Sequence, residues 1–222
     1  MPAPISVIVP TLNAEAVLHT CLEALMEGVD AGLLAEVVVS DGGSSDATLK
    51  LADAWGANIV TGAPSRGGQL RRGCDAARAE WFLVLHADTV LSPGWSDAVS
   101  ACLGQGAAGY FKLKFDRGGR FVAGWANLRA RWFGLPYGDQ GLLVRRDVYA
   151  RIGGYPDIPL MEDVSIVRAL RGQLKAIDAI AVTRADKYRA QGWVTRGTRN
   201  LWTLARFFCG VSPERLAADY RR

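Results

Sequence analysis

Residues 35–62 read "AEVVVSDGGSSDATLKLADAWGANIVTG", and this stretch decides the fold class. Residues 35–43 are an apolar run that enters a glycine turn, which predicts a buried strand. Residues 45–56 have the pattern of an amphipathic helix, with a serine or aspartate available as its N-cap and a glycine at its end. Residues 57–62 predict a short third element, again a strand. A strand, a helix of about a dozen residues and a strand predict a right-handed βαβ unit in a parallel sheet.

The same alternation extends in both directions along the chain. Further strands are predicted at residues 5–10 and 80–89, and further helices at residues 14–28 and 67–79. Ligands of parallel sheets bind beyond the carboxyl ends of the strands. The sequence therefore directs attention to three segments, at residues 10–15, 40–45 and 86–89.

The second half of the chain has a different texture. Residues 107–115 and 141–155 predict strands and a short helix joined by glycine-rich loops, so the sheet is expected to become mixed. An amphipathic helix opened by acidic residues is predicted at 160–172, a final strand at 174–185, and one or two helices at 198–220. No repeat, low-complexity segment or proline-rich linker divides the chain.

Length and charge limit the classes of protein. The chain has 222 residues, of which 50% are hydrophobic and 22% charged, so one domain with a substantial core is expected. The net charge of +4 is concentrated in residues 184–222, where nine basic residues face three acidic ones, while the other 183 residues hold 17 basic and 19 acidic residues. This distribution argues against nucleic acid as a partner and favours an anionic membrane surface or a phosphorylated substrate.

Location is an expectation drawn from the same composition. No apolar run approaches the roughly 20 residues that span a bilayer, and the first 13 residues lack the basic region of a signal peptide. The four cysteines show no CxxC or CxxH spacing, so they are expected to be reduced, mostly buried thiols. These features predict a cytoplasmic protein, either free or peripheral to the inner face of the membrane.

Two aspartates stand out on chemical grounds. Asp88, in "LHADT" (85–89), offers the hard oxygen that Mg²⁺ and Mn²⁺ prefer, with His86 two positions before it. Asp41 precedes two glycines, so its carboxylate could accept a hydrogen bond from a nucleotide base while the backbone approaches the ligand closely. The alternative for Asp41 is an N-cap of the following helix.

A family resemblance rests on four motifs in this order: "SVIVPTLNAE" (6–15), "VVVSDGGSSDAT" (37–48), "LHADT" and "MEDVSIVRAL" (161–170). Together they resemble a family 2 glycosyltransferase of the GT-A fold, over roughly residues 4–175. The compact "RGGQLRRG" and the ending "GVSPERLAADY" are further similar to a small bacterial subgroup, the arsenosugar-biosynthesis-type glycosyltransferases. The resemblance implies an α/β, Rossmann-like three-layer sandwich with a mostly parallel, partly mixed sheet and a C-terminal helical segment.

The resemblance also implies an activity and its residues. Such an enzyme transfers a sugar from a nucleotide diphosphate-sugar, here of UDP type, to an acceptor hydroxyl with inversion and with Mn²⁺ or Mg²⁺. Asp88 would hold the metal, Asp163 would be the catalytic base with Glu162 beside it, and Asp139 and Gln140 would bind the acceptor. The donor-binding residues would be Pro10, Thr11, Asn13, Glu15, Asp41, Arg66, Gly67, His86 and Asp88.

The chain is predicted to be one domain of three parts: a nucleotide-binding half (1–100), an acceptor and catalytic half (101–185) and a basic, aromatic helical tail (186–222). The tail either packs on the core or on a second subunit, as in a homodimer, or lies at a membrane interface. Two other functions stay open. One is a non-catalytic nucleotide-sugar-binding protein, and the other is a nucleotidyltransferase, although residues 10–20 lack the glycine-rich basic loop expected of that class.

Overall fold

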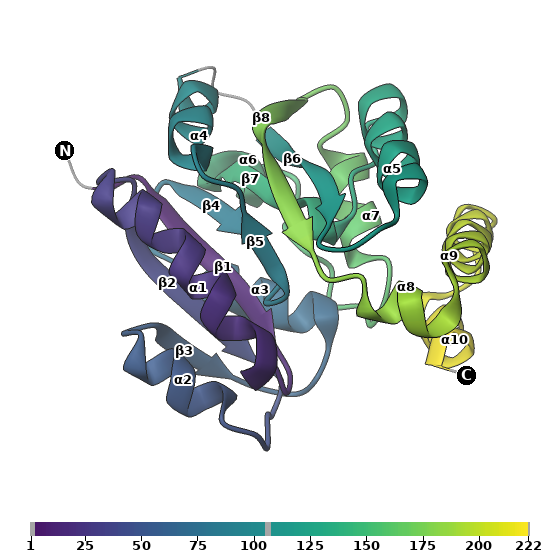
Figure 1. The fold of residues 1–222 in the computed structure, drawn as a ribbon, viewed down its shortest axis with the longest axis horizontal. Coiled ribbons are helices and arrows are strands. Elements are labelled where there is room, and N and C mark those ends of the chain that lie inside the picture. The colour runs from purple at the N-terminus through teal and green to yellow at the C-terminus, as the bar shows by residue number, and fades with distance from the viewer. Residues whose placement is uncertain (1–2, 105–107, 222) are drawn as a thin grey trace.

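The computed structural model describes residues 3–104 and 108–221. Within them, eight strands form one sheet in the order β3-β2-β1-β4-β7-β6-β8-β5 (Figure 1). The strands are β1 (Ile5–Thr11), β2 (Leu34–Asp41), β3 (Asn58–Thr61), β4 (Trp81–Val84), β5 (Thr89–Leu91), β6 (Ala108–Phe115), β7 (Leu142–Arg145) and β8 (Leu174–Thr183). The ends of the chain and residue 107, where one strand was predicted to begin, lie outside the described residues.

Helices cover both faces of the sheet, because the strands of its first half are apolar on both sides. Val7 and Val9 of β1 face a core shared with α1 (Glu15–Asp30), α2 (Thr48–Ala54) and α4 (Trp95–Leu103). Ile8 faces the opposite core, shared with α3 (Arg66–Ala76), α6 (Arg146–Arg151) and α7 (Glu162–Ala169). The remaining helices are α5 (Arg120–Phe133), the 3₁₀ turn η1 (Gly138–Gln140), α8 (Asp186–Gln191), α9 (Trp193–Phe208) and α10 (Pro213–Arg221). The result is the three-layer α/β sandwich that the sequence predicts.

The parallel part of the sheet fixes the place of the ligand. β1 pairs in parallel with β2 and with β4, and Thr11 lies opposite Asp41 at the carboxyl end. The chain adds β2 and β3 on one side of β1 and then crosses to add β4 on the other side. A crevice opens at such a reversal. Beyond β4 the sheet becomes mixed, as expected, because β7 is antiparallel to both β4 and β6.

The element boundaries differ from the prediction in three places. The strand predicted over 80–89 is two strands, because the chain turns after Leu85 and the Thr89 amide donates to the His86 carbonyl. Helices α4 and α5 were not predicted. The C-terminal segment forms α9 and α10, which are separated at Gly210, a residue with a φ of 83°.

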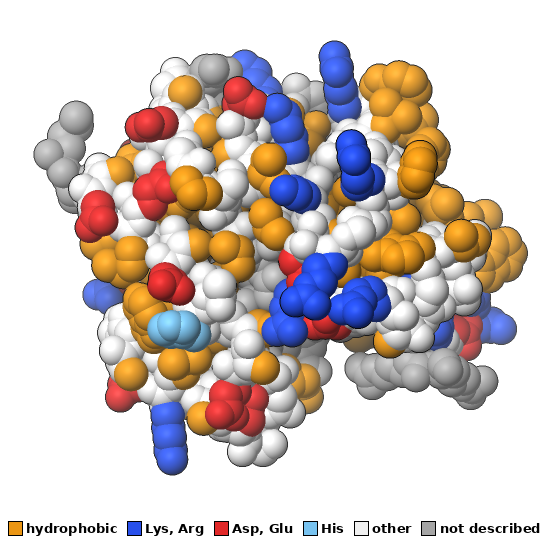
Figure 2. All heavy atoms as spheres, viewed as in Figure 1, with side chains coloured by type: hydrophobic (Ala, Val, Ile, Leu, Met, Phe, Trp, Pro, Cys, Tyr) orange, Lys and Arg blue, Asp and Glu red, His pale blue; other side chains and the backbone are white. Residues whose placement is uncertain are grey.

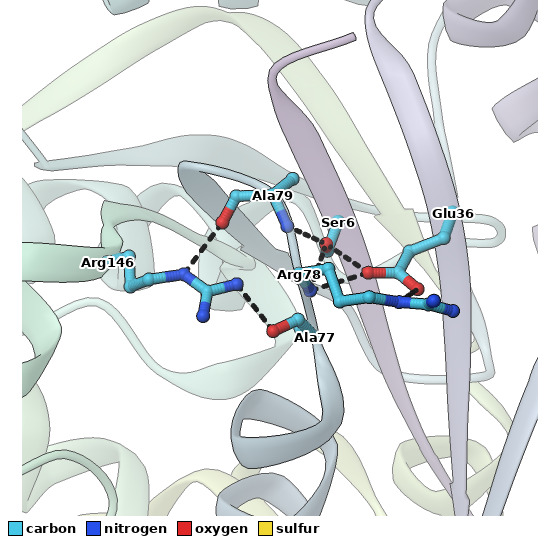
Figure 3. Close-up of polar contacts among 6 residues, drawn as sticks. All are labelled: Ser6, Glu36, Ala77, Arg78, Ala79 and Arg146. Atoms are coloured by element: carbon cyan, nitrogen blue, oxygen red, sulfur yellow. Dashed lines mark hydrogen bonds and ion pairs between the residues drawn. The ribbon is translucent and has the colours of Figure 1, made fainter. Parts of the chain in front are cut away.

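The amino ends of the same strands are tied by a separate polar network (Figure 3). Ser6 of β1 donates to the Glu36 carboxylate of β2 at 2.8 Å, and the Arg78 amide donates to that carboxylate at 2.6 Å. Arg146 of α6 donates to the carbonyls of Ala77 and Ala79. This network joins α6 to the strand ends remote from the crevice. Across the described parts of the chain, no helix has the length and apolar character needed to traverse a bilayer.

Candidate active site

A cleft of about 730 Å³ lies at the carboxyl edge of the sheet. The β1–α1 loop forms one wall, the start of α3 another, and the His86–Asp88 turn the floor. The C-terminal helices add a rim. Its lining residues are Pro10, Thr11, Leu12, Asn13, Ala14, Ala16, Val17, Arg66, Gln69, Leu70, His86, Ala87, Asp88, Glu162, Arg184, Asp186, Arg196 and Tyr220. A cleft of this size accommodates a ligand as large as a nucleotide.

A smaller chamber of about 140 Å³ adjoins this cleft. His86, Asp88 and Arg66 line both cavities, so the two spaces meet at these side chains. Asp139 and Asp163 line the chamber but not the cleft, whereas Glu162 lines the cleft but not the chamber. The adjacent acids of α7 therefore serve different spaces.

The turn that carries His86 and Asp88 is packed against the loop of η1. A Cβ atom on Gly138 would lie 2.5 Å from His86 Nε2, so only glycine lets the loop approach the imidazole. Below the turn, the Cys21 thiol donates to the His86 carbonyl at 3.7 Å. Burial raises the pKa of this thiol to about 12, and Asp88 adds to the rise, so Cys21 stays a neutral thiol. His86 is thus held from both sides at the junction of the two cavities.

Two loops at the donor end are bound to each other by side-chain hydrogen bonds. Asn13 accepts from the Ser45 amide at 2.9 Å, and Ser44 Oγ accepts from the Asn13 amide at 2.8 Å. Asp46 accepts from the Glu15 amide, and Glu15 in turn accepts from the Ala47 amide, each at 3.1 Å. This group is the donor-loop cluster: Thr11, Asn13, Glu15, Asp41, Ser44 and Asp46.

Asp41 is the centre of the donor-loop cluster. Its side chain is fully buried and accepts from Thr11 Oγ1 and from both the amide and the hydroxyl of Ser44, as well as from the Gly43 amide. Burial acts to raise the pKa of Asp41, but these hydrogen bonds outweigh it and lower the pKa below its usual value. Asp41 and Glu15 do not line the cleft, so in this structure they shape the walls that Pro10, Thr11 and Asn13 present to it.

The start of α3 supplies a cation and a close backbone contact. Arg66 lines the cleft, and its guanidinium lies 3.6 Å from the Glu162 carboxylate. Gly67 does not line the cleft. It packs against the loop at Pro156, where a side chain would overlap the carbonyl, and its amide donates to the Ile158 carbonyl. Gln69 joins the ends of β1 and β2 by donating to the carbonyls of Thr11 and Ser40.

Glu162 is the most strongly perturbed acid of the cleft. The residue is only 1% exposed, and its Oε2 makes no hydrogen bond within the described residues. Burial raises the pKa of Glu162 to about 7, with Asp163 adding to the rise and Arg66 opposing it. Near neutral pH this carboxyl group therefore exchanges a proton readily, which marks it as a functional candidate.

Asp163 is oriented by backbone amides. Its Oδ2 accepts from the Gly138 amide at 3.0 Å, and its Oδ1 accepts from the Val164 amide at 2.7 Å. The left-handed conformation of Met161, with a φ of 69°, precedes α7 and turns its first two acids toward the cavities. Because a carboxylate has about four lone-pair sites, both oxygens of Asp163 retain accepting capacity toward the chamber.

The acceptor side carries two polar residues that the sequence analysis did not select, Arg129 and Tyr137, beside Asp139, which it did select. Asp139 Oδ1, Tyr137 Oη and Arg129 Nη2 are buried and make no hydrogen bond within the described residues. The Arg129 guanidinium lies 3.5 Å from the centre of the Tyr137 ring. Burial raises the pKa of Asp139 to about 6, and Arg129 opposes the rise. These three residues are called the acceptor cluster.

Gln140, the second residue predicted to bind an acceptor, points away from the chamber. It is fully buried, and its amide nitrogen donates to the Phe111 carbonyl and to Asn127. Its Oε1 accepts from the Tyr137 amide. Because its hydrogen-bonding groups are used in this way, Gln140 braces the η1 turn and thereby positions Asp139.

The C-terminal segment contributes to the site directly. Arg184, Arg196 and Tyr220 line both cavities, and Arg184 pairs with Asp186 at 2.8 Å. Arg196 and Tyr220 belong to the basic, aromatic tail, which the sequence analysis assigned to packing on the core or on a second subunit, or to a membrane. The junction at Asp88 is therefore surrounded by three arginines: Arg66, Arg184 and Arg196.

The fold is of the GT-A type, with a Rossmann-like sheet, a nucleotide-sized cleft at its switch point and an acid at the junction with a second cavity. The model of the family "Glycosyl transferase family 2" matches residues 6–149, and the chain belongs to this family. The PGL/p-HBAD biosynthesis glycosyltransferase of Mycobacterium tuberculosis is 37% identical over 99 residues. That match covers 41% of this chain and 38% of the relative's length.

Solved structures share the fold. Glucosyl-3-phosphoglycerate synthase from Mycobacterium tuberculosis, in complex with Mn²⁺, UDP and glucosyl-3-phosphoglycerate, superposes with a TM-score of 0.59 at 23% identity. The match covers 82% of this chain and 70% of the synthase. S. aureus TarS 1–349 in complex with UDP-GlcNAc gives a TM-score of 0.63 at 18% identity and covers 82% of this chain and 59% of that one. The GT-A architecture expected from the sequence motifs is confirmed.

Proposed function

We propose that the protein transfers a sugar from a nucleotide diphosphate-sugar, of UDP type, to an acceptor hydroxyl with inversion of configuration. The observation that carries this proposal is the division of the two cavities. The cleft is nucleotide-sized, the chamber adjoins it at His86 and Asp88, and Asp163 lies on the chamber side only. An inverting transfer requires this order, because the base that takes the acceptor proton lies opposite the departing diphosphate.

The donor would lie along the cleft, with the nucleotide between the β1–α1 loop and α3. The diphosphate would reach the junction, where Arg66, Arg184 and Arg196 provide positive charge. Asp41 supports this site through the loops that it orders. His86, held against Gly138, would contact the ribose or the sugar from the floor of the cleft.

A divalent cation, Mn²⁺ or Mg²⁺, fits this junction. Asp88 offers a half-buried carboxylate to both cavities. In the described parts of the chain, no set of three or more His, Cys, Asp or Glu side chains is arranged to hold a metal, so diphosphate oxygens would supply the other ligands. When bound, the cation would neutralise the charge that develops on the leaving diphosphate. Two solved relatives of this fold contain Mn²⁺ beside UDP or GDP-Man.

The acceptor hydroxyl would enter the chamber and donate its proton to Asp163. The Gly138 amide fixes the orientation of that carboxylate, and Asp139 would contact the remaining polar groups of the acceptor. Glu162 would act from the cleft side by holding Arg66 near the diphosphate. The motifs "RGGQLRRG" and "LHADT" and the ending "GVSPERLAADY" support a place in the small arsenosugar-biosynthesis-type subgroup, and we propose this narrower assignment on these three features alone.

A thermal-shift panel of nucleotide diphosphates and nucleotide sugars, with and without Mn²⁺, tests the donor part of the proposal. A ligand at about 1,000 times its Kd stabilises the folded chain by roughly 4 kcal/mol, so the correct nucleotide is readily distinguished. Donor hydrolysis or transfer is then measured with the nucleotide that stabilises most. Stabilisation without any turnover would instead support a non-catalytic nucleotide-sugar-binding protein. The absence of stabilisation by every nucleotide would contradict the proposed function.

A further inference from the structure

Helices α5 and α9 carry most of the exposed apolar surface of the described residues. Eight of the eleven large hydrophobic side chains found exposed lie on these two helices. They form what we call the apolar face: Phe121, Trp125, Trp132, Phe133, Val194, Leu201, Trp202 and Phe208. Phe121 is 96% exposed and Val194 78%. In Figure 2 hydrophobic side chains gather on the side of the molecule where Figure 1 places α5 and α9.

On α9 the charged side chains face the protein and a stripe of apolar side chains faces outward, which is the reverse of a helix that only packs on a core. Its arginines point inward: Arg199 donates to the carbonyls of Asp219 and Tyr220, and Arg206 pairs with Asp219 at 2.8 Å. Its outward stripe instead contains Val194, Leu201 and Trp202, spaced seven and eight residues apart on one helix face. The arginines are thus paired within the protein, and no other part of the chain that the structure describes covers the apolar stripe.

The charge around this face is positive. Neither α5 nor α9 contains an aspartate or a glutamate. Arg120 and Arg131 are exposed near the two ends of α5, and Arg117 and Arg189 are exposed on the adjoining segments. None of these four makes an ion pair among the residues that the structure describes. An anionic, partly apolar surface is the complement of such a face.

The apolar face also borders the acceptor chamber. A narrow cavity of about 30 Å³ lies between α5 and α9, with Trp125 and Leu201 among its lining residues. Asp139 and Tyr137 line both this cavity and the chamber. The space between the two helices therefore continues from the apolar face toward the proposed acceptor site.

We propose that the apolar face seats the protein on the surface of an anionic lipid bilayer, with aromatic side chains in the headgroup region and the flanking arginines against lipid phosphates. A second copy of this chain fits less well, because a symmetric interface would place the acid-free faces, with Arg120 and Arg131, against each other. Seating in this orientation turns the acceptor side of the site toward the lipid. That consequence rests on the proposed function, whereas binding to the bilayer does not require turnover.

Vesicle flotation of the full chain tests the proposal. Vesicles of phosphatidylcholine alone are compared with vesicles that also contain phosphatidylglycerol, at low and high salt. We expect binding to the phosphatidylglycerol vesicles that weakens as salt screens the charge. The double variant Trp125→Ser/Trp202→Ser should lose most binding, and Arg120→Glu/Arg131→Glu should weaken it by roughly tenfold or more, since each basic residue contributes severalfold.

The matched control is Met26→Ser/Val29→Ser on α1, which removes hydrophobic side chains that are 41% and 47% exposed but lie outside the apolar face. It should bind as the unmodified chain does. If Trp125→Ser/Trp202→Ser is unfolded by circular dichroism, Phe121→Ser replaces it, because Phe121 has almost no packing to lose. Failure of the unmodified chain to bind, or equal losses in the control, overturns the proposal. So does a dimer by light scattering that Trp125→Ser/Trp202→Ser converts to monomer, which would assign the face to a second copy.

Discussion

The donor-loop cluster and the acceptor cluster lie at opposite sides of one site and treat their polar groups differently. In the donor-loop cluster, Asp41 accepts four hydrogen bonds and its pKa is lowered. In the acceptor cluster, Arg129, Tyr137 and Asp139 each bury one polar atom that makes no hydrogen bond within the described residues, and Glu162 does the same at the edge of the cleft. Burial raises the pKa of Asp139 to about 6 and that of Glu162 to about 7. The donor-loop cluster stabilises the fold. The acceptor cluster leaves buried polar atoms available to a ligand, which lowers the stability of the protein.

The largest effect is expected from Asp163→Asn, which tests the chamber side of the comparison. Asparagine retains the size of the side chain and an oxygen for one of the two backbone amides, but it does not accept the acceptor proton. Turnover should fall by about 10²–10⁴-fold, the range of general acid–base assistance, with donor affinity close to that of the unmodified chain. Steady-state kinetics and a calorimetric donor Kd provide the two readouts.

Glu162→Gln is the matched control, because the neighbouring acid lines the cleft and not the chamber. It should reduce turnover less and act mainly on binding. Normal turnover in Asp163→Asn together with a dead Glu162→Gln would exchange the two roles. If neither substitution changes turnover, the inverting mechanism proposed for this site is wrong.

Asp41→Ala should have the next largest effect. It should act on the stability of the folded protein and not on the transfer reaction. Removing a buried carboxylate leaves the Thr11 and Ser44 hydroxyls and two amides without their acceptor, so the free energy of unfolding should fall by about 2–4 kcal/mol. Asp139→Ala, which removes an acid with an unpartnered oxygen, should cost much less. Urea unfolding of both variants measures the difference, and equal losses would break the distinction between the clusters.

The pH dependence of the Asp41 contribution follows from the sign of its shift. The folded pKa of Asp41 is lower than the unfolded value of about 3.9. The stabilisation is therefore fully present above the unfolded pKa and is lost as pH falls through the folded pKa. The stability gap between the unmodified chain and Asp41→Ala should be constant from neutral pH to about pH 5 and should narrow in more acidic solution.

The smallest of these effects is a gain of stability in Glu162→Gln at alkaline pH. The folded pKa of Glu162 is raised from 4.5 to about 7, so the folded state loses stability as pH rises through that range. Glutamine carries no charge to desolvate, and the variant should be more stable by about 1–3 kcal/mol at pH 8. The gain should disappear near pH 5. Thermal unfolding at both pH values checks it, and a gain independent of pH would point to packing instead of charge.

The sequence predicts the first half of the fold well, because its strands and helices bury apolar residues at regular spacing. β1 and β2 are apolar on both faces, and the helices between them have clear amphipathic patterns, so alternation and parallel pairing follow from local sequence. The β4–β5 break was missed because the polar residues of "WFLVLHADTVL" lie at the end of the predicted strand, and only the tertiary turn at His86 shows that the chain divides there. Helix α5 was missed although its pattern is amphipathic; small residues such as Ala123 and Ala126 face the core, and its large apolar residues face outward.

For the candidate site, the sequence motifs identified residues that also lie near the other residues of their motif in space. His86, Asp88 and Asp163 lie around one junction, as their motif order indicates. Arg129 and Tyr137 reach Asp139 only through the packing of α5 against η1, which no local pattern encodes. Gln140 was selected for its polarity, but the pairing of its amide with the Phe111 carbonyl directs it into the core.

The central claim is that a metal-held diphosphate joins the cleft to the chamber at Asp88, and calorimetric titration of UDP with and without Mn²⁺ tests it most directly. The unmodified chain should bind UDP more tightly with Mn²⁺ than without it. Asp88→Ala should remain folded and bind UDP weakly, with no gain from Mn²⁺, because the protein's hard anionic ligand at the junction is gone. An unchanged Mn²⁺-dependent gain in Asp88→Ala would contradict the claim and place the metal elsewhere.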